Sequence, residues 1–409
     1  MDSYTTFSGI RAARFVGALL FLTAGSHAWS QSGTVPDYIN SLADFQVAQL
    51  DGTLAPTNGN VSMKSVTPIE WQTLDPSSGG LSAVIIPWSG GAKATGGSTL
   101  FVHGGGHSDG ANNGLYIYDF SGGAKPTGWQ APLAISSIAS ILVSNVLYAD
   151  GLPTSVHTYD GVVWAKHNNT VYRFKGSIYG AGNQTNASFK YNVGTKTWTR
   201  LPDYPTNDGF AAVTFYDPVS GNIFVAPIDG TTGHFFRTSN DTWSGQKTLG
   251  GSGVGEVSAA WDPTRSRGIV LGEETNRRVL FSLNFSAETA SGTPITLTGA
   301  TEVVQRGMSV VYDPGRDSYW LFGGASGDPG WTTLYEIPAG GPWNIVAHPL
   351  TGAQIQRVTG MIGSYGRYVF MDQWRAIGVV ASTTSPAFVI KLPAANVVSP
   401  RSPLNLTAN

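Results

Sequence analysis

The 409-residue chain is rich in glycine, with 52 residues, and in aromatic side chains, at 11%, whereas charged side chains make up only 12%. This composition is typical of short strands joined by tight turns and argues against a solvated helical surface. The formal net charge of −2 provides no basic field for nucleic acid or a membrane surface, and the absence of cysteine excludes disulfides, thiol chemistry and Cys-ligated zinc.

The first thirty residues have the pattern of a secretory signal peptide. Arg11 and Arg14 form a positive end, FVGALLFLTAG (15–25) is a short apolar core, and SHAWSQS (26–32) supplies small residues for cleavage. This core is too short to cross a bilayer, which needs roughly twenty apolar residues. We therefore expect residues 1–30 to be a signal peptide, and the mature protein to be soluble and either periplasmic or secreted.

A repeat of about 45 residues runs through the rest of the chain. The unit at 211–243 reads as a strand, an Asp-Pro turn, a second strand, a Gly turn, a third strand and a Trp-bearing fourth strand. Similar units lie at 82–131, 157–202, 258–283, 309–337 and 365–392. Four short strands in each unit predict the blades of a β-propeller.

The sequence therefore predicts one all-β propeller domain over residues 36–395, with six or seven four-stranded blades. The last unit lacks an obvious fourth strand, and DFQVAQL (44–50) is expected to supply it, so that an N-terminal strand closes the ring. A seventh blade is left open at 36–80 or in the insertion 133–155. Residues 398–409 are expected to form a flexible tail, and the protein is expected to be a monomer.

The repeat resembles that of kelch and galactose-oxidase-type propellers. The shared features are apolar-Tyr-Asp-Pro turns such as FYDP (215–218), the stretch LFGGASG (321–327) and the stretch TKTWTRLP (195–202). The resemblance covers most of the expected mature chain and implies the fold. Propellers host enzymes and binding modules alike, so it does not assign a function.

The loop HGGGHSDGANN (103–113) lies between the second and third strands of the first unit. It lacks the lysine and helix of a phosphate loop, the helix that a zinc-binding His pair needs, and the alternating carboxylates of a calcium loop. We expect the glycines to form a tight turn and His103 to pack within the blade. His107 should lie at the mouth of the central channel, because such loops share a face with the connections between blades.

Other polar residues are expected at the same mouth, because they precede an innermost strand or lie between a second and a third strand. They are His157, Tyr159, Asn207, Asp208, Glu256, Arg306, Arg357, Tyr365 and Arg367 in the first group, and Asn112, Glu273, Glu274, Asn276 and Trp331 in the second. Imidazole, phenol and guanidinium groups together suit an anionic sugar. We predict an anionic polysaccharide or oligosaccharide as the partner, and neither nucleic acid nor a membrane.

Guanidinium groups bind carboxylates bidentately, so Arg306 and Arg367 are predicted to hold a uronic acid. Neutralising that carboxylate lowers the pKa of the sugar C5 proton. A nearby Tyr or His then removes the proton, and a second group protonates the leaving glycosidic oxygen. This β-elimination is the reaction of a polysaccharide lyase and needs no redox cofactor.

In overall plan the chain is similar to the propeller-type polysaccharide lyases that act on ulvan and related uronate polysaccharides, which use His, Tyr and Arg at the channel mouth. By residue type and blade position, the similarity implies His107 and Arg306 as carboxylate binders and His157, Tyr159 or Tyr365 as base or acid. The predicted catalytic residues are His157, Tyr159, Tyr365 and His107, and the predicted substrate-binding residues are Arg306, Arg367, Arg357, Trp331, Asn112 and Glu256. No cofactor or metal ligand is predicted, and a structural or substrate-bridging divalent cation is left open.

The main alternative is a non-catalytic kelch-like propeller that binds glycans or proteins, with Trp331 and Tyr179 as stacking platforms. A glycosidase is a further alternative, since Glu256 with Glu273 or Glu274 would supply two carboxylates. A sialic-acid mutarotase-like enzyme is also compatible with an exported propeller of this size. A copper centre like that of galactose oxidase is excluded, because it requires a Cys–Tyr crosslink.

Overall fold

The computed structural model divides the chain into two units, residues 1–32 and residues 33–409. The residues that the structure describes are 34–50, 63–73, 84–85, 88–92, 97–121, 128–180, 182–209, 211–227, 231–249, 256, 258–272, 279–324, 331–355, 363–381 and 386–396. The expected signal peptide (1–30), the expected tail (398–409) and the mouth candidates Glu273, Glu274, Asn276 and Arg357 lie outside the described residues.

The described strands form blades in which each sheet runs outward from an innermost strand. Blade 1 consists of β2 (Gly91–Ala92), β3 (Thr99–Val102), β4 (Leu115–Asp119) and β5 (Gly128–Leu133). Blade 2 consists of β7 (Val162–Ala165), β8 (Thr170–Phe174), β10 (Ser188–Asn192) and β11 (Thr197–Arg200). Blade 3 consists of β12 (Ala212–Tyr216), β13 (Ile223–Pro227), β14 (Thr232–Arg237) and β15 (Thr242–Trp243), with β16 (Lys247–Thr248) also paired to β14.

The second half of the ring follows the same order. Blade 4 consists of β17 (Ser258–Asp262), β18 (Arg267–Leu271), β19 (Val279–Asn284) and β20 (Thr289–Pro294). Blade 5 consists of β22 (Ser309–Asp313), β23 (Ser318–Phe322), β24 (Thr333–Pro338) and β25 (Asn344–Pro349), with β21 (Thr298–Gly299) at its outer edge. Blade 6 consists of β27 (Tyr368–Met371), β28 (Ala376–Val380), β29 (Ala387–Lys391) and β1 (Gln46–Leu50), with β26 (Thr351–Gly352) at its outer edge.

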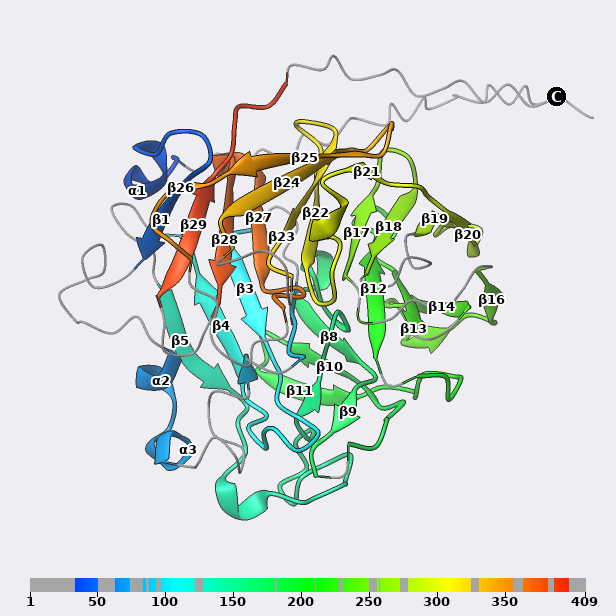
Figure 1. Ribbon diagram of the computed structural model, residues 1–409. Helices are drawn as coiled ribbons and strands as arrows, with labels where there is room; N and C mark the ends of the chain where they lie inside the picture. Colours follow the sequence, from blue (N-terminus) through cyan, green and yellow to red (C-terminus); the bar gives the residue numbers. More distant parts are fainter. Residues whose placement is uncertain are drawn as a thin grey trace, which may run out of the picture. The chain divides into compact units, whose positions relative to one another are not determined.

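The innermost strands of successive blades contact one another in the order β2, β7, β12, β17, β22 and β27, and β27 also contacts β3 of the first blade. Within the described residues the six sheets are therefore arranged as a propeller ring (Figure 1). This confirms the all-β propeller that the repeat predicts and selects six blades from the predicted six or seven.

Helices contribute little to the described part of the chain. They are α1 (Asp37–Asn40), α2 (Met63–Val66), α3 (Ile69–Thr73) and the 3-10 turns η3 (Ile138–Ser140), η4 (Lys166–Asn168), η5 (Thr301–Val303) and η6 (Asp372–Trp374). Among the described residues, none of these helices is long and apolar enough to cross a membrane. The insertion 133–155 contains η3 and leads into β6 (Val156–His157), which pairs with β9 (Ser177–Ile178).

Strand β1 comes from the N-terminal side of the repeats but lies in blade 6. It pairs antiparallel with β29, in a register that places Val47 opposite Ile390 and Leu50 opposite Ala387. On its other side it pairs in parallel with β26. Blade 6 is therefore assembled from both ends of the described chain.

The inner strands are apolar at successive positions, and not at alternate ones, because each blade packs between two others. Every residue is buried in β23 (SYWLF), β27 (YVFM) and β28 (AIGVV). A sheet with one solvated face would show alternation, whereas a sheet covered on both faces reads as a continuous apolar run. The core consequently lies between blades as well as within them.

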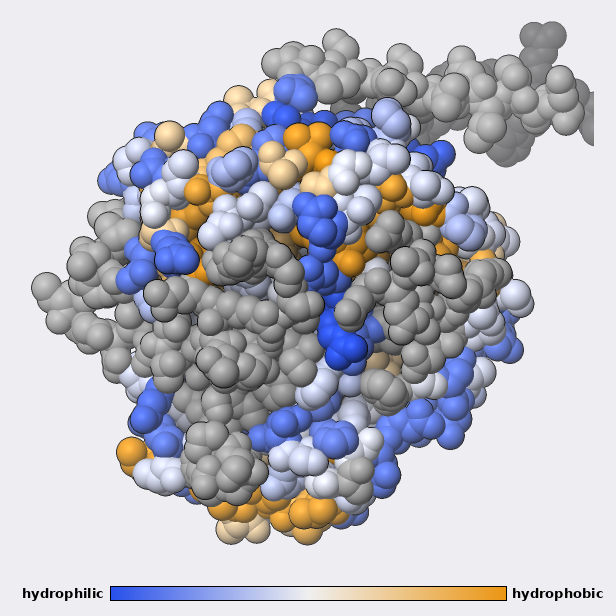
Figure 2. Space-filling view, in the orientation of Figure 1, coloured by the Kyte–Doolittle hydropathy of each residue, from blue (hydrophilic) through white to orange (hydrophobic). Residues whose placement is uncertain are grey.

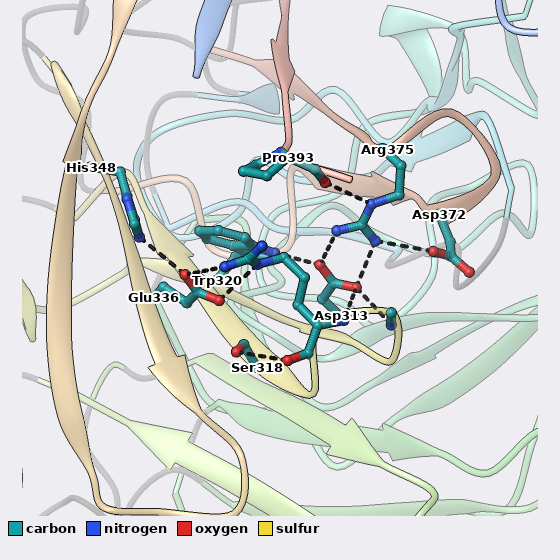
Figure 3. Close-up of polar contacts among 10 residues, drawn as sticks. Asp313, Ser318, Trp320, Glu336, His348, Asp372, Arg375 and Pro393 are labelled. Carbon is teal, nitrogen blue, oxygen red and sulfur yellow. Dashed lines mark hydrogen bonds and ion pairs between the residues drawn. The ribbon is translucent and has the colours of Figure 1, made fainter. Parts of the chain in front are cut away.

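The aspartates of the repeated turns have a local and a long-range role, which Figure 3 shows for Asp313. Its Oδ1 accepts hydrogen bonds from the backbone N–H groups of Gly315 (2.9 Å) and Arg316 (3.2 Å), the pattern by which Asp stabilises a turn. The same carboxylate accepts two charge-assisted bonds from Arg375 of blade 6, at 2.7 and 2.6 Å. Asp313 thus stabilises its own turn in blade 5 and also binds Arg375 of blade 6.

A second ionic cluster lies beside the point where β1 joins the ring. Glu336 of β24 accepts hydrogen bonds from Arg316 Nε (2.9 Å) and from His348 Nε2 (3.1 Å), as seen for His348 in Figure 3. The His348 ring stacks on Phe45, next to β1, with ring centroids 4.4 Å apart. Burial raises the pKa of Glu336, but the hydrogen bonds from His348 and Arg316 outweigh it and lower the pKa to about 2.

We predict that Glu336→Gln destabilises the protein at neutral pH and that this difference shrinks in acid. Because the folded-state pKa is lowered, the carboxylate stabilises the fold fully above its unfolded pKa of about 4.5 and loses this effect as pH falls toward 2. The wild-type free energy of unfolding should exceed that of Glu336→Gln by about 2 kcal/mol at pH 7. Denaturant unfolding from pH 7 to pH 3 measures the difference. The exposed Glu302→Gln is the control, and an equal gap at both ends of the range would contradict the prediction.

Candidate functional site

The loop between β3 and β4 lies close to the β6–β9 pair because of its glycines. Gly105 and Gly106 have φ values of +98° and +83°, in the region that favours glycine. A Cβ at Gly106 would overlap the backbone nitrogen of His157 and the carbonyl oxygen of Ser177. The three-glycine motif therefore lets two distant segments touch, and it places His107 beside His157.

The two imidazoles form a stacked pair at this contact. Their ring centroids are 5.5 Å apart, with an interplanar angle of 17°. His157 is 2% exposed, whereas His107 is exposed. Asp109 Oδ2 lies 2.7 Å from His157 Nε2, and Trp88 stacks on the same ring at 4.9 Å. One imidazole thus faces solvent, while the other is held between a carboxylate, an indole and its partner ring.

The environment of His157 determines its protonation. Burial lowers the pKa of His157, the hydrogen bond and charge of Asp109 raise it in part, and His107 lowers it slightly again. Because the net pKa is below the ordinary value of 6.5, His157 is predominantly neutral at pH 7. A carboxylate only accepts hydrogen bonds, so Nε2 carries the proton and Nδ1 keeps its lone pair.

A series of contacts continues from His157 across the propeller. His157 meets Tyr159 edge-on at 5.9 Å, and Tyr159 meets Tyr365 edge-on at 5.8 Å. The Tyr365 hydroxyl donates to Glu256 Oε2 at 3.4 Å, and Arg306 Nε lies 3.3 Å from the same oxygen. We call the residues joined in this way the mouth cluster; they are His107, Asp109, His157, Tyr159, Tyr365, Glu256 and Arg306.

The mouth cluster comes from five blades. His107 and Asp109 lie in the loop between β3 and β4, and the other members lie on the connections into the innermost strands of blades 2, 4, 5 and 6. The structure therefore brings together all four residues predicted to be catalytic and two of the six predicted to bind substrate. Their proximity follows from the radial arrangement of the blades.

The two phenols are buried inside the mouth cluster. Tyr159 is 3% exposed and Tyr365 is fully buried. Burial, together with the neighbouring Glu256 carboxylate, raises the pKa of Tyr365 well above 10. A phenol in this state stays protonated at neutral pH, and a side chain without solvent access does not touch a glycan. The predicted base or acid role of Tyr159 and Tyr365 is therefore corrected to a structural one.

Arg367 is placed in the core and not on the mouth surface. It is fully buried, and its guanidinium donates to the backbone carbonyls of Gly363 (2.8 Å), Ser89 and Val380 (3.4 Å). Burial lowers its pKa to about 9. Because the guanidinium N–H groups of Arg367 already donate to backbone carbonyls of blades 1 and 6, its predicted role in carboxylate binding is corrected to a structural one.

Trp331 and Asn112 are also part of the interior. Trp331 is 1% exposed, donates from Nε1 to Gly324 O at 3.2 Å and packs on Phe322. Asn112 is fully buried, donates to the Tyr116 hydroxyl at 3.0 Å and accepts from the Gly114 N–H at 2.9 Å. Neither side chain offers a surface to a sugar, so their predicted substrate contacts are corrected.

Other expectations for this face have mixed outcomes. His103 is 1% exposed and accepts from Arg173 Nη1 at 3.1 Å, which confirms that it packs inside the structure. Burial and the charge of Arg173 lower the pKa of His103 to about 3.

Asn207 and Asp208 lie on the connection into blade 3. Asn207 is exposed, and Asp208 accepts a hydrogen bond from Thr232 Oγ1 at 2.9 Å and lies near Lys175. Asp208 belongs to a separate polar group on the connection into blade 3.

Sequence reasoning missed Asp109 and Trp88. Asp109 lies in the same loop as His107, two residues after it, but a single carboxylate in that loop indicates neither a calcium site nor a partner for the distant His157. Nothing in the sequence near Trp88 indicates a partner for His157. Among the described residues, no group of three or more His, Asp or Glu side chains is arranged to hold a metal ion.

Comparisons with known proteins support the fold. No protein-family model and no curated protein matches the sequence. Among solved structures, one described as "Structure of YjhT" matches with a TM-score of 0.50 and 16% sequence identity, covering 77% of this chain and 97% of that chain. A likeness at this identity shows the fold alone. The chain is a β-propeller, and its kelch-type resemblance stays a prediction.

We predict that Asp109→Asn lowers the pKa of His157 further. The amide still accepts a hydrogen bond from Nε2, but it lacks the negative charge that favours the imidazolium form. An NMR titration of the imidazole resonances measures the shift. Asp203→Asn, which removes an exposed carboxylate paired with Arg200, is the control. An unchanged or raised pKa of His157 would show that Asp109 does not act on it through charge.

Proposed function

We propose that this protein is a carbohydrate-active propeller that cleaves a uronic-acid-containing glycan by β-elimination at the exposed end of the mouth cluster. The observation that carries the proposal is the stacked imidazole pair, in which His107 faces solvent and His157 is buried and hydrogen-bonded to Asp109. An exposed imidazole with a fixed orientation is suited to proton transfer at neutral pH.

The proposed reaction needs only a proton acceptor and a proton donor. His107 removes the C5 proton of the uronic acid, and the C5–H electron pair forms the C4=C5 double bond as the C4–O bond breaks. The leaving glycosidic oxygen takes its proton from the protonated His107, so the imidazole returns to its initial state. His107 is the catalytic residue of the proposal, and His157, held by Asp109 and Trp88, is a positioning residue.

Arg306 supports a negatively charged substrate. Its side chain is 45% exposed, and its Nε lies 3.3 Å from Glu256 Oε2. A guanidinium binds carboxylates with directional, charge-assisted hydrogen bonds, so Arg306 is suited to a uronate. If that uronate is the reacting sugar, Arg306 also lowers the pKa of the C5 proton. If it is a neighbouring sugar, Arg306 contributes to binding only.

The expected signal peptide supports a substrate outside the cytoplasm, since it would deliver the protein to the periplasm or the medium. The fold is compatible with this chemistry but does not select it.

We predict that the purified protein generates unsaturated uronides from at least one of polyglucuronate, alginate and pectate, measured by the rise in ultraviolet absorbance. His107→Ala should lower kcat by about 10²- to 10⁴-fold, the usual size of a general acid–base contribution. His167→Ala, which changes an exposed histidine outside the mouth cluster, should retain activity. Full activity in His107→Ala would contradict the mechanism, and binding without product would indicate a non-catalytic module.

We predict that Arg306→Ala impairs the same reaction, whereas Arg200→Ala, an exposed arginine of β11, does not. A fall in kcat would place the Arg306-bound carboxylate on the reacting sugar, and a rise in KM alone would place it on a neighbouring sugar. Steady-state kinetics on the cleaved polysaccharide measures both parameters. Unchanged kcat and KM would remove Arg306 from the site.

A further inference from the structure

An apolar surface projects from the insertion between blades 1 and 2. Leu142 is 39% exposed, Val143 59% and Leu147 38%, and we call these three side chains the apolar rim. They are three of the six large apolar side chains exposed in the described part of the chain. No charged residue occurs from Ala134 to Ala149. Figure 2 shows an apolar area at the lower edge of the molecule, where the insertion lies in Figure 1.

The insertion is held in place by its own hydrogen bonds. The backbone N–H of Ala149 donates to Ser140 O at 2.9 Å, and that of Thr154 donates to Val146 O at 3.0 Å. Tyr148 is 2% exposed, and its hydroxyl donates to Ala111 O at 2.7 Å. Because these hydrogen bonds and the buried Tyr148 hold the loop, the exposed side chains of the apolar rim belong to a hydrogen-bonded segment.

The apolar rim adjoins the proposed catalytic residue. The backbone N–H of Ser144 donates to Tyr179 O at 2.9 Å, and that of Gly180 donates to His107 O at 2.5 Å. A Cβ at Gly180 would overlap Val143, and a Cβ at Gly182 would overlap the His107 ring. Gly180 and Gly182, which both have positive φ and leave no room for a Cβ, therefore lie between the apolar rim and His107.

The size and position of the apolar rim narrow down its occupant. A stable dimer buries about 800 Å² on each partner, which three partly exposed side chains do not supply. A sugar held at His107, by contrast, would lie next to this surface, because Gly180 donates to His107 O and adjoins Val143. Exposed apolar surface of this kind marks a binding site when it adjoins a polar one.

We propose that the apolar rim binds a hydrocarbon chain attached to the glycan held at the mouth cluster, so that the ligand is an amphiphilic, acylated or alkylated sugar. The proposal rests on the proposed function insofar as the mouth cluster binds the sugar. The proposal adds an apolar subsite beside the polar subsite that binds the sugar. Burying methylene groups against Leu142, Val143 and Leu147 removes apolar area from water and tightens binding.

The experiment compares octyl β-glucuronide with methyl β-glucuronide, below the micelle concentration of the former, by calorimetry. The wild-type protein should bind the octyl compound at least tenfold more tightly. The triple variant Leu142→Ser, Val143→Ser and Leu147→Ser should bind the two compounds equally. Val219→Ser, which changes an apolar side chain that is 88% exposed elsewhere, is the control and should keep the octyl preference. The three substituted side chains are exposed, and a thermal melt checks that the variant is folded.

Several results would overturn the proposal. An equal affinity of the wild-type protein for both glucuronides would do so, as would an octyl preference that survives in the triple variant. A third result would identify the apolar rim as a membrane contact instead. In that case the wild-type protein would show no octyl preference but would sediment with phosphatidylethanolamine–phosphatidylglycerol vesicles, and the triple variant would not sediment with them. A failure of the proposed function would give a different result. An octyl preference without any unsaturated product would contradict the elimination reaction but would still support binding of a hydrocarbon chain at the apolar rim.

Discussion

Each blade of this propeller buries both of its faces against other blades, and the remaining features depend on this constraint. It explains why inner strands such as β23 and β28 are apolar at every position and why glycine is so frequent in the loops, where chains from different blades approach closely. It also explains the ionic links between neighbouring blades, of which the pair of Asp313 and Arg375 is one. A blade removed from this ring would expose two apolar faces.

The same constraint creates the mouth cluster. The connections into the innermost strands converge on one face, and residues as distant in sequence as His107 and Tyr365 become parts of one contact series. Buried aromatic rings hold the series in place, while polar groups at its two ends reach solvent. Tyr159 and Tyr365 are buried and pack in the middle of the series, whereas His107 and Arg306 lie at its ends and are accessible to solvent.

Strand order was sufficient to predict the fold and the proximity of His107, His157, Tyr365 and Arg306. It could not predict which side chains at that face are exposed. Arg306 and Arg367 both precede an innermost strand, yet Arg367 is buried because three backbone carbonyls happen to lie within reach of its guanidinium. Acceptors of this kind are set by tertiary packing and leave no pattern in the sequence. The pairing of Asp109 with His157 was missed for a similar reason, because it depends on the close approach that Gly106 permits.

The register of β1 has a consequence for how the chain reaches its native state. Val47 pairs with Ile390, so the partner of one of the first strands to be synthesised is among the last. Until then β1 has an unpaired edge, and unpaired edges invite association with other chains. Contacts between residues so far apart in sequence also slow folding. Blade 6 can therefore be completed only after β29 has been synthesised, and until then the nascent protein has five blades and an incomplete sixth.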